Sequence, residues 1–133
     1  MIFLLDTNSI ADILTSQVGV TREMQLHIAQ GDTLGLCRPV YYEVFRGLLW
    51  RNATNKLAFF NHHIGLFFTW LDLIDVDWGQ AAQFWASARS RGKQLVDIDV
   101  LLAALAYRLN ATIVSSDQDF AALPIRRINW RTP

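Results

Sequence analysis

Cysteine, proline and glycine are scarce in this sequence, and neither sign of charge is in excess. The single cysteine, Cys37, excludes a disulfide framework and a thiolate metal cluster. Its apolar surroundings, LGLC, indicate a small core residue. Basic and acidic residues number 12 each, so the formal net charge is zero. A nucleic-acid partner would therefore have to be attracted by a local patch of positive charge.

The sequence also lacks an apolar run of the roughly 20 residues that a membrane-spanning helix needs. Its first residues, MIFLLD, have no basic segment before the apolar stretch, so we expect no secretory signal. No repeat, low-complexity tract or linker divides the chain. Since 52% of the 133 residues are hydrophobic, the sequence predicts one packed domain over residues 1–133, located in the cytoplasm.

Short apolar runs alternate with helical patterns along the chain. We expect strands at residues 2–5, 33–37, 71–76, 111–117 and 125–129. Helices are expected at residues 9–14, 20–31, 39–51, 52–71, 77–92 and 97–110. Thr21 and Asp77 are the predicted starts of two of these helices, and Gly31 and Gly92 are predicted ends. The alternation predicts an α/β fold, a central parallel sheet of four to five strands with helices on both faces.

Four separate segments bring an acidic residue to one edge of this predicted sheet. Asp6 follows the first strand, and Glu43 lies early in the helix after the second strand. Asp97 and Asp99 begin the last long helix, and Asp117 ends the strand after it. Ligands of parallel sheets bind beyond the carboxyl ends of the strands, so we expect a functional site at this edge.

Crowded carboxylates repel one another, and a divalent cation would offset that cost. Mg²⁺ and Mn²⁺ prefer oxygen ligands, and the sequence has no cysteine and histidine cluster for zinc. A metal held by carboxylates beside a phosphodiester can orient a water molecule and stabilise the developing charge.

Each acid also has a purely structural interpretation. Asp6 and Asp97 are suited to cap helices, and Glu43 and Asp99 could sit in a helix only for its dipole or for solvation. Asp117 could start a turn. The convergence of four segments at one edge favours a shared site over five separate explanations.

The motifs LLDTNSI, YYEVFRGLL, DIDVLLAALA and IVSSDQDF occur in this order, and together they resemble a PIN domain. The closest group is the VapC-like toxins of bacterial and archaeal toxin–antitoxin pairs, and the resemblance covers essentially the whole chain. It implies a PIN-like three-layer α/β sandwich. It also implies a Mg²⁺- or Mn²⁺-dependent endoribonuclease that cuts RNA through a metal-activated water.

The resemblance assigns the family's four invariant acids to Asp6, Glu43, Asp99 and Asp117, and it implies that Asp6, Asp99 and Asp117 contact the metal. Asp97 is then an additional acid that caps its helix or supports the site. Thr7 and Asn8 complete the DTN motif and are expected to orient the acids.

One motif departs from the family pattern. Relatives often carry threonine and asparagine before the last acid, where this chain has Ser115 and Ser116. A serine hydroxyl can still bind a phosphate or orient a carboxylate, so activity is still expected.

Cations are expected around an acidic site that accepts RNA. The candidates, each of which could instead belong to a solvated surface, are Arg38, Arg46, Arg89, Arg91 and Lys93.

Aromatic residues are in surplus over residues 52–71, and they serve either core packing or a surface covered by another chain. In VapC-like proteins the early helices form homodimers and a groove for the antitoxin. His62 and His63 point about 100° apart on a helix and are expected near the surface.

Two other classes of function compete with the nuclease. A non-catalytic module with the same fold would act only through a protein partner, although all four acids are retained. A phosphotransfer domain of the aspartyl-phosphate type needs a second aspartate two residues after the first, where this chain has Asn8.

Overall fold

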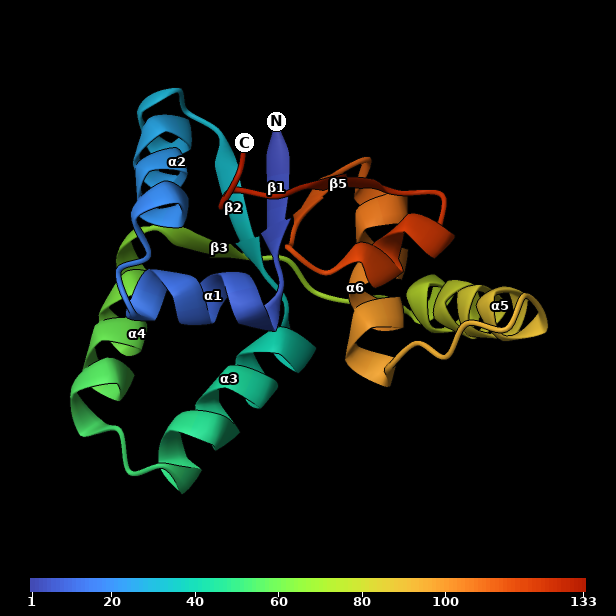
Figure 1. The fold of residues 1–133 in the computed structure, drawn as a ribbon, viewed down its shortest axis with the longest axis horizontal. Coiled ribbons are helices and arrows are strands. Elements are labelled where there is room, and N and C mark those ends of the chain that lie inside the picture. Colours follow the sequence, from blue (N-terminus) through green and yellow to red (C-terminus); the bar gives the residue numbers. More distant parts are fainter.

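Five short parallel strands form the centre of the computed structural model, which describes residues 1–133 (Figure 1). The strands are β1 (Ile2–Leu5), β2 (Thr33–Leu36), β3 (Phe68–Trp70), β4 (Thr112–Val114) and β5 (Arg126–Ile128). Their order in the sheet is β3-β2-β1-β4-β5, and every neighbouring pair is parallel. The α/β fold with a central parallel sheet that the sequence predicts is confirmed.

Helices cover both faces of the sheet. They are α1 (Thr7–Leu14), α2 (Val18–Ala29), α3 (Arg38–Trp50), α4 (Thr54–Leu66), α5 (Asp75–Ser90) and α6 (Asp97–Leu109), and a short 3-10 helix, η1 (Gln118–Ala122), precedes β5. Figure 1 shows α1, α2 and α4 on one side of the strands and α5 and α6 on the other. The chain moves outward from β1 to β3 and then crosses to β4, so right-handed connections place the two sets of helices on opposite faces.

The central strands are apolar because they are buried on both faces. In β1, Phe3, Leu4 and Leu5 are almost inaccessible to solvent, and Ile113 of β4 is fully buried. Gly35 of β2 packs so closely that an added Cβ would lie 2.7 Å from a methyl group of Leu4, which excludes a larger residue without repacking. Cys37 is fully buried as expected, and burial raises the pKa of its thiol to about 11.

Two predicted elements are wrong in position. The aromatic helix ends at Leu66, and Phe68–Trp70 form the edge strand β3 by pairing with β2. The predicted strand at residues 71–76 does not form, because α5 begins at Asp75. The residue that precedes α5 is Ile74, whose N–H donates to the carboxylate of Asp77 at 2.9 Å. Asp77 therefore stabilises the first turn of α5 from inside the helix and does not start it.

Two predicted helix caps and one histidine also differ from expectation. Gln17, not Thr21, caps α2, since its side chain accepts from the N–H of Val20. Asp97 is the first residue of α6, and the capping position belongs to Val96. His63 is buried rather than near the surface, because its ring packs among aromatic side chains.

None of the helices combines the length and the apolar character that crossing a lipid bilayer requires.

Candidate active site

Asp6 lies where β1 ends, beside β4, at the point where the order of the strands reverses. Its carboxylate is 5% exposed and accepts two hydrogen bonds. One comes from the N–H of Ser9 at 2.8 Å, so Asp6 caps α1. The other comes from the hydroxyl of Ser115 at 2.5 Å. The structural interpretation of Asp6 as a helix cap is therefore confirmed, and its role in a metal site stays a prediction.

Ser115 connects the acid after β1 to the acid after β4. Its hydroxyl donates to Asp6 and accepts from the backbone N–H of Asp117 at 2.9 Å. Asp117 in turn accepts from the N–H of Asp119 at 2.9 Å and caps η1. Ser115 is buried, and in this structure it orients a carboxylate. Ser116 is half-buried beside it.

Glu43 and Asp99 reach the same edge from α3 and α6. Both helices begin at the carboxyl ends of the strands, as Figure 1 shows. Burial and then the negative charges of Asp117, Asp6, Glu43 and Asp119 together raise the pKa of Asp99 to about 7. Burial also raises the pKa of Asp6, with a smaller contribution from Asp117 and against the hydrogen bonds from Ser115 and Ser9. The four predicted acids thus act on one another electrostatically.

Asp97 is separate from this group. Its side chain is exposed, and it lines a hollow between α5 and α6 together with Trp78 and Trp85. Asp97 is not among the charges that raise the pKa of Asp99. Two positions in the first turn of α6, separated by Ile98, therefore carry one acid within the acidic group and one outside it.

The predicted cations differ in how they are engaged. Arg46 lies 3.6 Å from the carboxylate of Glu43. Arg38 lies over the ring of Trp70 at 3.7 Å and pairs with Asp72 at 3.6 Å. Arg89 lies over Trp85, and Arg91 donates to the carbonyl groups of Ser87 and Ala122. Lys93 is exposed.

The donor chemistry of the acidic group suits a hard divalent cation, since every charged donor is a carboxylate oxygen. No group of three or more His, Cys, Asp or Glu side chains is arranged to hold one ion directly. Mg²⁺ keeps several of its waters in proteins and is often bound through only one or two carboxylates. The arrangement therefore fits a hydrated ion, contacted directly by some of these acids and through water by the others.

A cleft between α1 and α3 opens beside Glu43. Its volume is about 300 Å³, and we call it the α1–α3 cleft. Its polar and charged lining includes Thr7, Asn8, Thr15, Glu43, Arg46, Arg51 and Lys56. Arg51 and Lys56 are absent from the residues predicted for the site. The spacing of Glu43, Gly47 and Arg51 at four-residue intervals was a signal, because it places them on one face of a helix.

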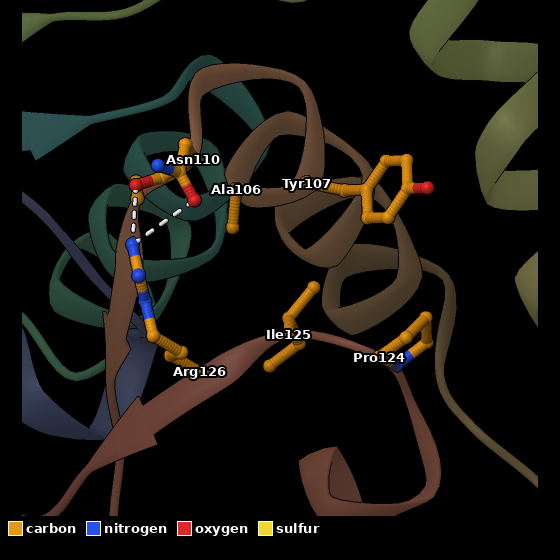
Figure 2. Close-up of a pocket in the computed structure, with 7 residues that line it drawn as sticks. Ala106, Tyr107, Asn110, Pro124, Ile125 and Arg126 are labelled. Carbon is orange, nitrogen blue, oxygen red and sulfur yellow. Dashed lines mark hydrogen bonds between the residues drawn. The ribbon is translucent and has the colours of Figure 1, made fainter.

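A second cavity lies at the opposite end of α6 (Figure 2). Asn110 ends α6 in the left-handed conformation, with φ of 54°. The guanidinium group of Arg126 donates to its carbonyl oxygen at 2.6 Å and to its side-chain oxygen at 3.2 Å. The wall is otherwise apolar, with Tyr107, Pro124 and Ile125. These contacts close the end of a helix and bring no acid or nucleophile together.

The chain belongs to the PIN domain family. The family model described as PIN domain matches residues 3–125, which confirms the family that the sequence motifs predict. No curated protein sequence shows significant similarity to the chain.

Solved structures share the fold at low sequence identity. A chain of VapBC2 from Rickettsia felis, in a structure bound to a DNA fragment from its promoter, is 19% identical with a TM-score of 0.86 over 98% of this chain and 99% of that chain. A chain of VapBC-1 from nontypeable Haemophilus influenzae is 18% identical with a TM-score of 0.82 over 98% of both chains. A chain of FitAcB from Neisseria gonorrhoeae is 22% identical with a TM-score of 0.80 over 96% of this chain and 97% of that chain. The fold is thus that of a VapC-like PIN domain.

Proposed function

We propose that this protein is a Mg²⁺- or Mn²⁺-dependent endoribonuclease and the toxin of a VapBC-type toxin–antitoxin pair. The observation that carries the proposal is the environment of Asp99, whose pKa is raised to about 7 by burial and by the charges of four other carboxylates. Such a group is costly to keep in a folded protein unless a cation binds there. The PIN domain family and the VapBC structures with the same fold support the same assignment.

Each residue of the proposed site would have a distinct role. Asp6, Asp99 and Asp117 hold the metal, directly or through its waters, and Glu43 completes the negative field. The bound ion would lower the pKa of a water molecule and stabilise charge on the phosphodiester. Ser115 fixes the orientation of Asp6 and the position of Asp117 through its two hydrogen bonds. Thr7 and Asn8 lie at the start of α1, where they would help to orient the acids or the phosphate group.

Cleavage of RNA by the Asp99→Asn variant tests this proposal. With Mg²⁺ or Mn²⁺ the wild-type protein should cut single-stranded RNA, and EDTA should stop the reaction. Asp99→Asn should reduce the rate by about a thousandfold, because the carboxylate that faces the metal is lost. Asp75→Asn is the matched control, since Asp75 is an exposed acid in the first turn of α5. Wild-type rates in Asp99→Asn would contradict the proposal.

A groove between α2 and α4 supports an antitoxin as partner. It has a volume of about 400 Å³ and an apolar lining that includes Met24, Ile28, Phe59 and Phe67. The buried hydroxyl of Thr21 lies in the same lining and has no hydrogen-bond partner. An amphipathic helix would cover the apolar side chains and could bond this hydroxyl. Phe59→Arg, at a lining residue that is 41% exposed, should abolish co-purification with the protein encoded by the adjacent upstream reading frame, whereas Trp50→Ala should not.

Exposed aromatic side chains support a homodimer. Tyr42, Trp78 and Trp85 are 59%, 56% and 40% exposed on neighbouring parts of α3 and α5. A second copy of the chain would remove this apolar surface from water. Trp78→Glu should convert a dimer to a monomer in light-scattering measurements, and the isolated, exposed Trp50 provides the control as Trp50→Ala. An unchanged mass for Trp78→Glu would place the dimer contact elsewhere.

A further inference from the structure

The α1–α3 cleft adjoins the acidic group through Glu43 and has a basic lining. Arg46 and Arg51 line it from α3, and Lys56 lines it from the start of α4. Glu43 is the one acidic side chain in the lining. Positive charge therefore exceeds negative charge in the cleft, although the net charge of the whole chain is zero.

Two of these cations have no ionic partner within the protein. Arg46 pairs with Glu43 at 3.6 Å, but Arg51 and Lys56 form no salt bridge. The guanidinium group of Arg51 lies along α3 beside Gly47, where an added Cβ would be 3.5 Å from its nearest nitrogen. The absence of a side chain at Gly47 leaves the path along the helix open between Glu43 and Arg51.

The opposite wall of the cleft carries neutral hydrogen-bonding groups. Thr7, Asn8 and Thr15 project from α1. The hydroxyl of Thr7 is buried and has no hydrogen-bond partner in the protein. An unsatisfied buried hydroxyl is costly, so a ligand that accepts a hydrogen bond there is favoured. Threonine and asparagine side chains, together with arginine and lysine, are the groups that proteins use against phosphate oxygens.

We propose that the α1–α3 cleft binds the phosphodiester backbone of single-stranded RNA next to the bond that is cut. This inference depends on the proposed ribonuclease function, and it assigns Arg51 and Lys56 to substrate binding. A narrow cleft admits a single strand but not an RNA duplex. The cations of the lining, Arg46, Arg51 and Lys56, form a row that ends at Glu43. Such a row can bind several successive phosphate groups, whereas a single peptide carboxylate would need only one cation.

The same edge has a second basic region, which fits RNA less well. Arg91 already donates to two backbone carbonyl groups, and Arg89 lies over Trp85. Their guanidinium groups are oriented by backbone carbonyl groups and by an aromatic ring, whereas the side chains of Arg51 and Lys56 have no hydrogen bond or ionic partner in the protein; in the second region only the exposed Lys93 is comparable. The direction of approach is therefore along α3 and not along the end of α5.

Binding of single-stranded RNA in EDTA tests the inference without cleavage. Fluorescence anisotropy with a labelled oligonucleotide should show the Arg51→Ala/Lys56→Ala variant to bind about tenfold more weakly, with a slope of log affinity against log salt reduced by about 1.4 for two lost phosphate contacts. Both side chains are exposed, so the fold should be intact by circular dichroism. Arg22→Ala, an exposed cation on α2, should bind as the wild type does.

Three outcomes would overturn the inference. The first is a wild-type slope in the double variant, and the second is a larger loss in Arg89→Ala than in Arg51→Ala. The third is displacement of the RNA by hexaglutamate at equal total charge, which would show a site for acidic peptides. Failure of the proposed function has a different signature. In that case the RNA binds through Arg51 and Lys56, but neither Mg²⁺ nor Mn²⁺ supports cleavage.

Discussion

The acidic residues at the two ends of the sheet differ in whether they have cationic partners. At the amino end, Asp32 accepts from the amino group of Met1 at 3.0 Å and contacts His27 at 2.8 Å. At the start of α5, Arg108 of α6 donates to the buried carboxylate of Asp77 at 2.9 Å. At the carboxyl end, Asp6, Glu43, Asp99 and Asp117 act on one another, and only Glu43 has a cation within 4 Å.

The difference appears in the direction of the pKa shifts. Hydrogen bonds from His27 and from the amino terminus lower the pKa of Asp32. Burial and neighbouring carboxylates raise the pKa of Asp99 to about 7. A lowered pKa means that ionised Asp32 stabilises the fold, and a raised pKa means that ionised Asp99 destabilises it. Ionisation therefore destabilises the fold at Asp99 and not at Asp32, and Asp99 is where the proposed function places the metal.

Removing the cationic partner of Asp77 should produce the largest effect on stability. Arg108→Ala leaves the carboxylate of Asp77, which is 1% exposed, without its cation. The free energy of unfolding should fall by about 3 kcal/mol, because an uncompensated charge is then buried. Urea denaturation at pH 7 measures this change, with Arg22→Ala as the control. A loss below about 0.5 kcal/mol, the size of an ordinary surface effect, would show that Asp77 does not depend on the pair.

Removing the charge of Asp99 should increase the stability of the protein. Since the pKa of Asp99 is about 7 when folded and 3.8 for the ordinary group, the wild type loses stability as the pH rises between these values. In EDTA at pH 8, Asp99→Asn should be more stable by about 1–2 kcal/mol, a figure reduced for the partial exposure of this side chain. At pH 4 the gain should disappear.

The neighbouring acid on α6 makes the comparison sharper. Asp97→Asn changes an exposed carboxylate two residues away and should alter stability by less than about 0.5 kcal/mol at either pH. Equal gains in Asp97→Asn and Asp99→Asn would show that the net charge of the protein, and not the local group, decides the effect.

The smallest effect is expected at Asp32. Because the pKa of this carboxyl is lowered in the folded protein, its contribution is present above the ordinary value and is lost as the pH falls through the lowered one. Asp32→Asn should lower Tm by about 1–2 °C at pH 7. Calorimetry at pH 7 and at pH 2.5 checks this, since the difference should shrink at the lower pH. A rise in Tm at pH 7 would contradict the comparison.

Local sequence patterns predicted most of the fold. Buried strands such as IFLL are continuous apolar runs, and α6 shows a clear helical spacing of leucines, so both are found within a few residues of their observed bounds. The edge strand β3 was missed because Phe68–Trp70 continue the aromatic run of α4. Their strand conformation depends on hydrogen bonds to β2, which no local pattern encodes.

The candidate site divides in the same way. The four acids could be chosen from their places after strands and at helix starts, together with the family motifs. The bond between Ser115 and Asp6 joins residues 109 positions apart and exists because β4 pairs with β1. Arg51 and Lys56 line the α1–α3 cleft only because α1 packs against α3, and their own surroundings in the sequence are ordinary for a solvated helix end.

The sequence by itself determined the family, the apolar strands and the position of an acid after β1 and β4, because burial and helix capping are properties of neighbouring residues. The tertiary structure alone decided that Asp99 lies in the field of four other carboxylates, and that Asp97 is not one of them. The strength of an electrostatic interaction depends on distance and on exclusion of water, and both are set only when the strands and helices pack together.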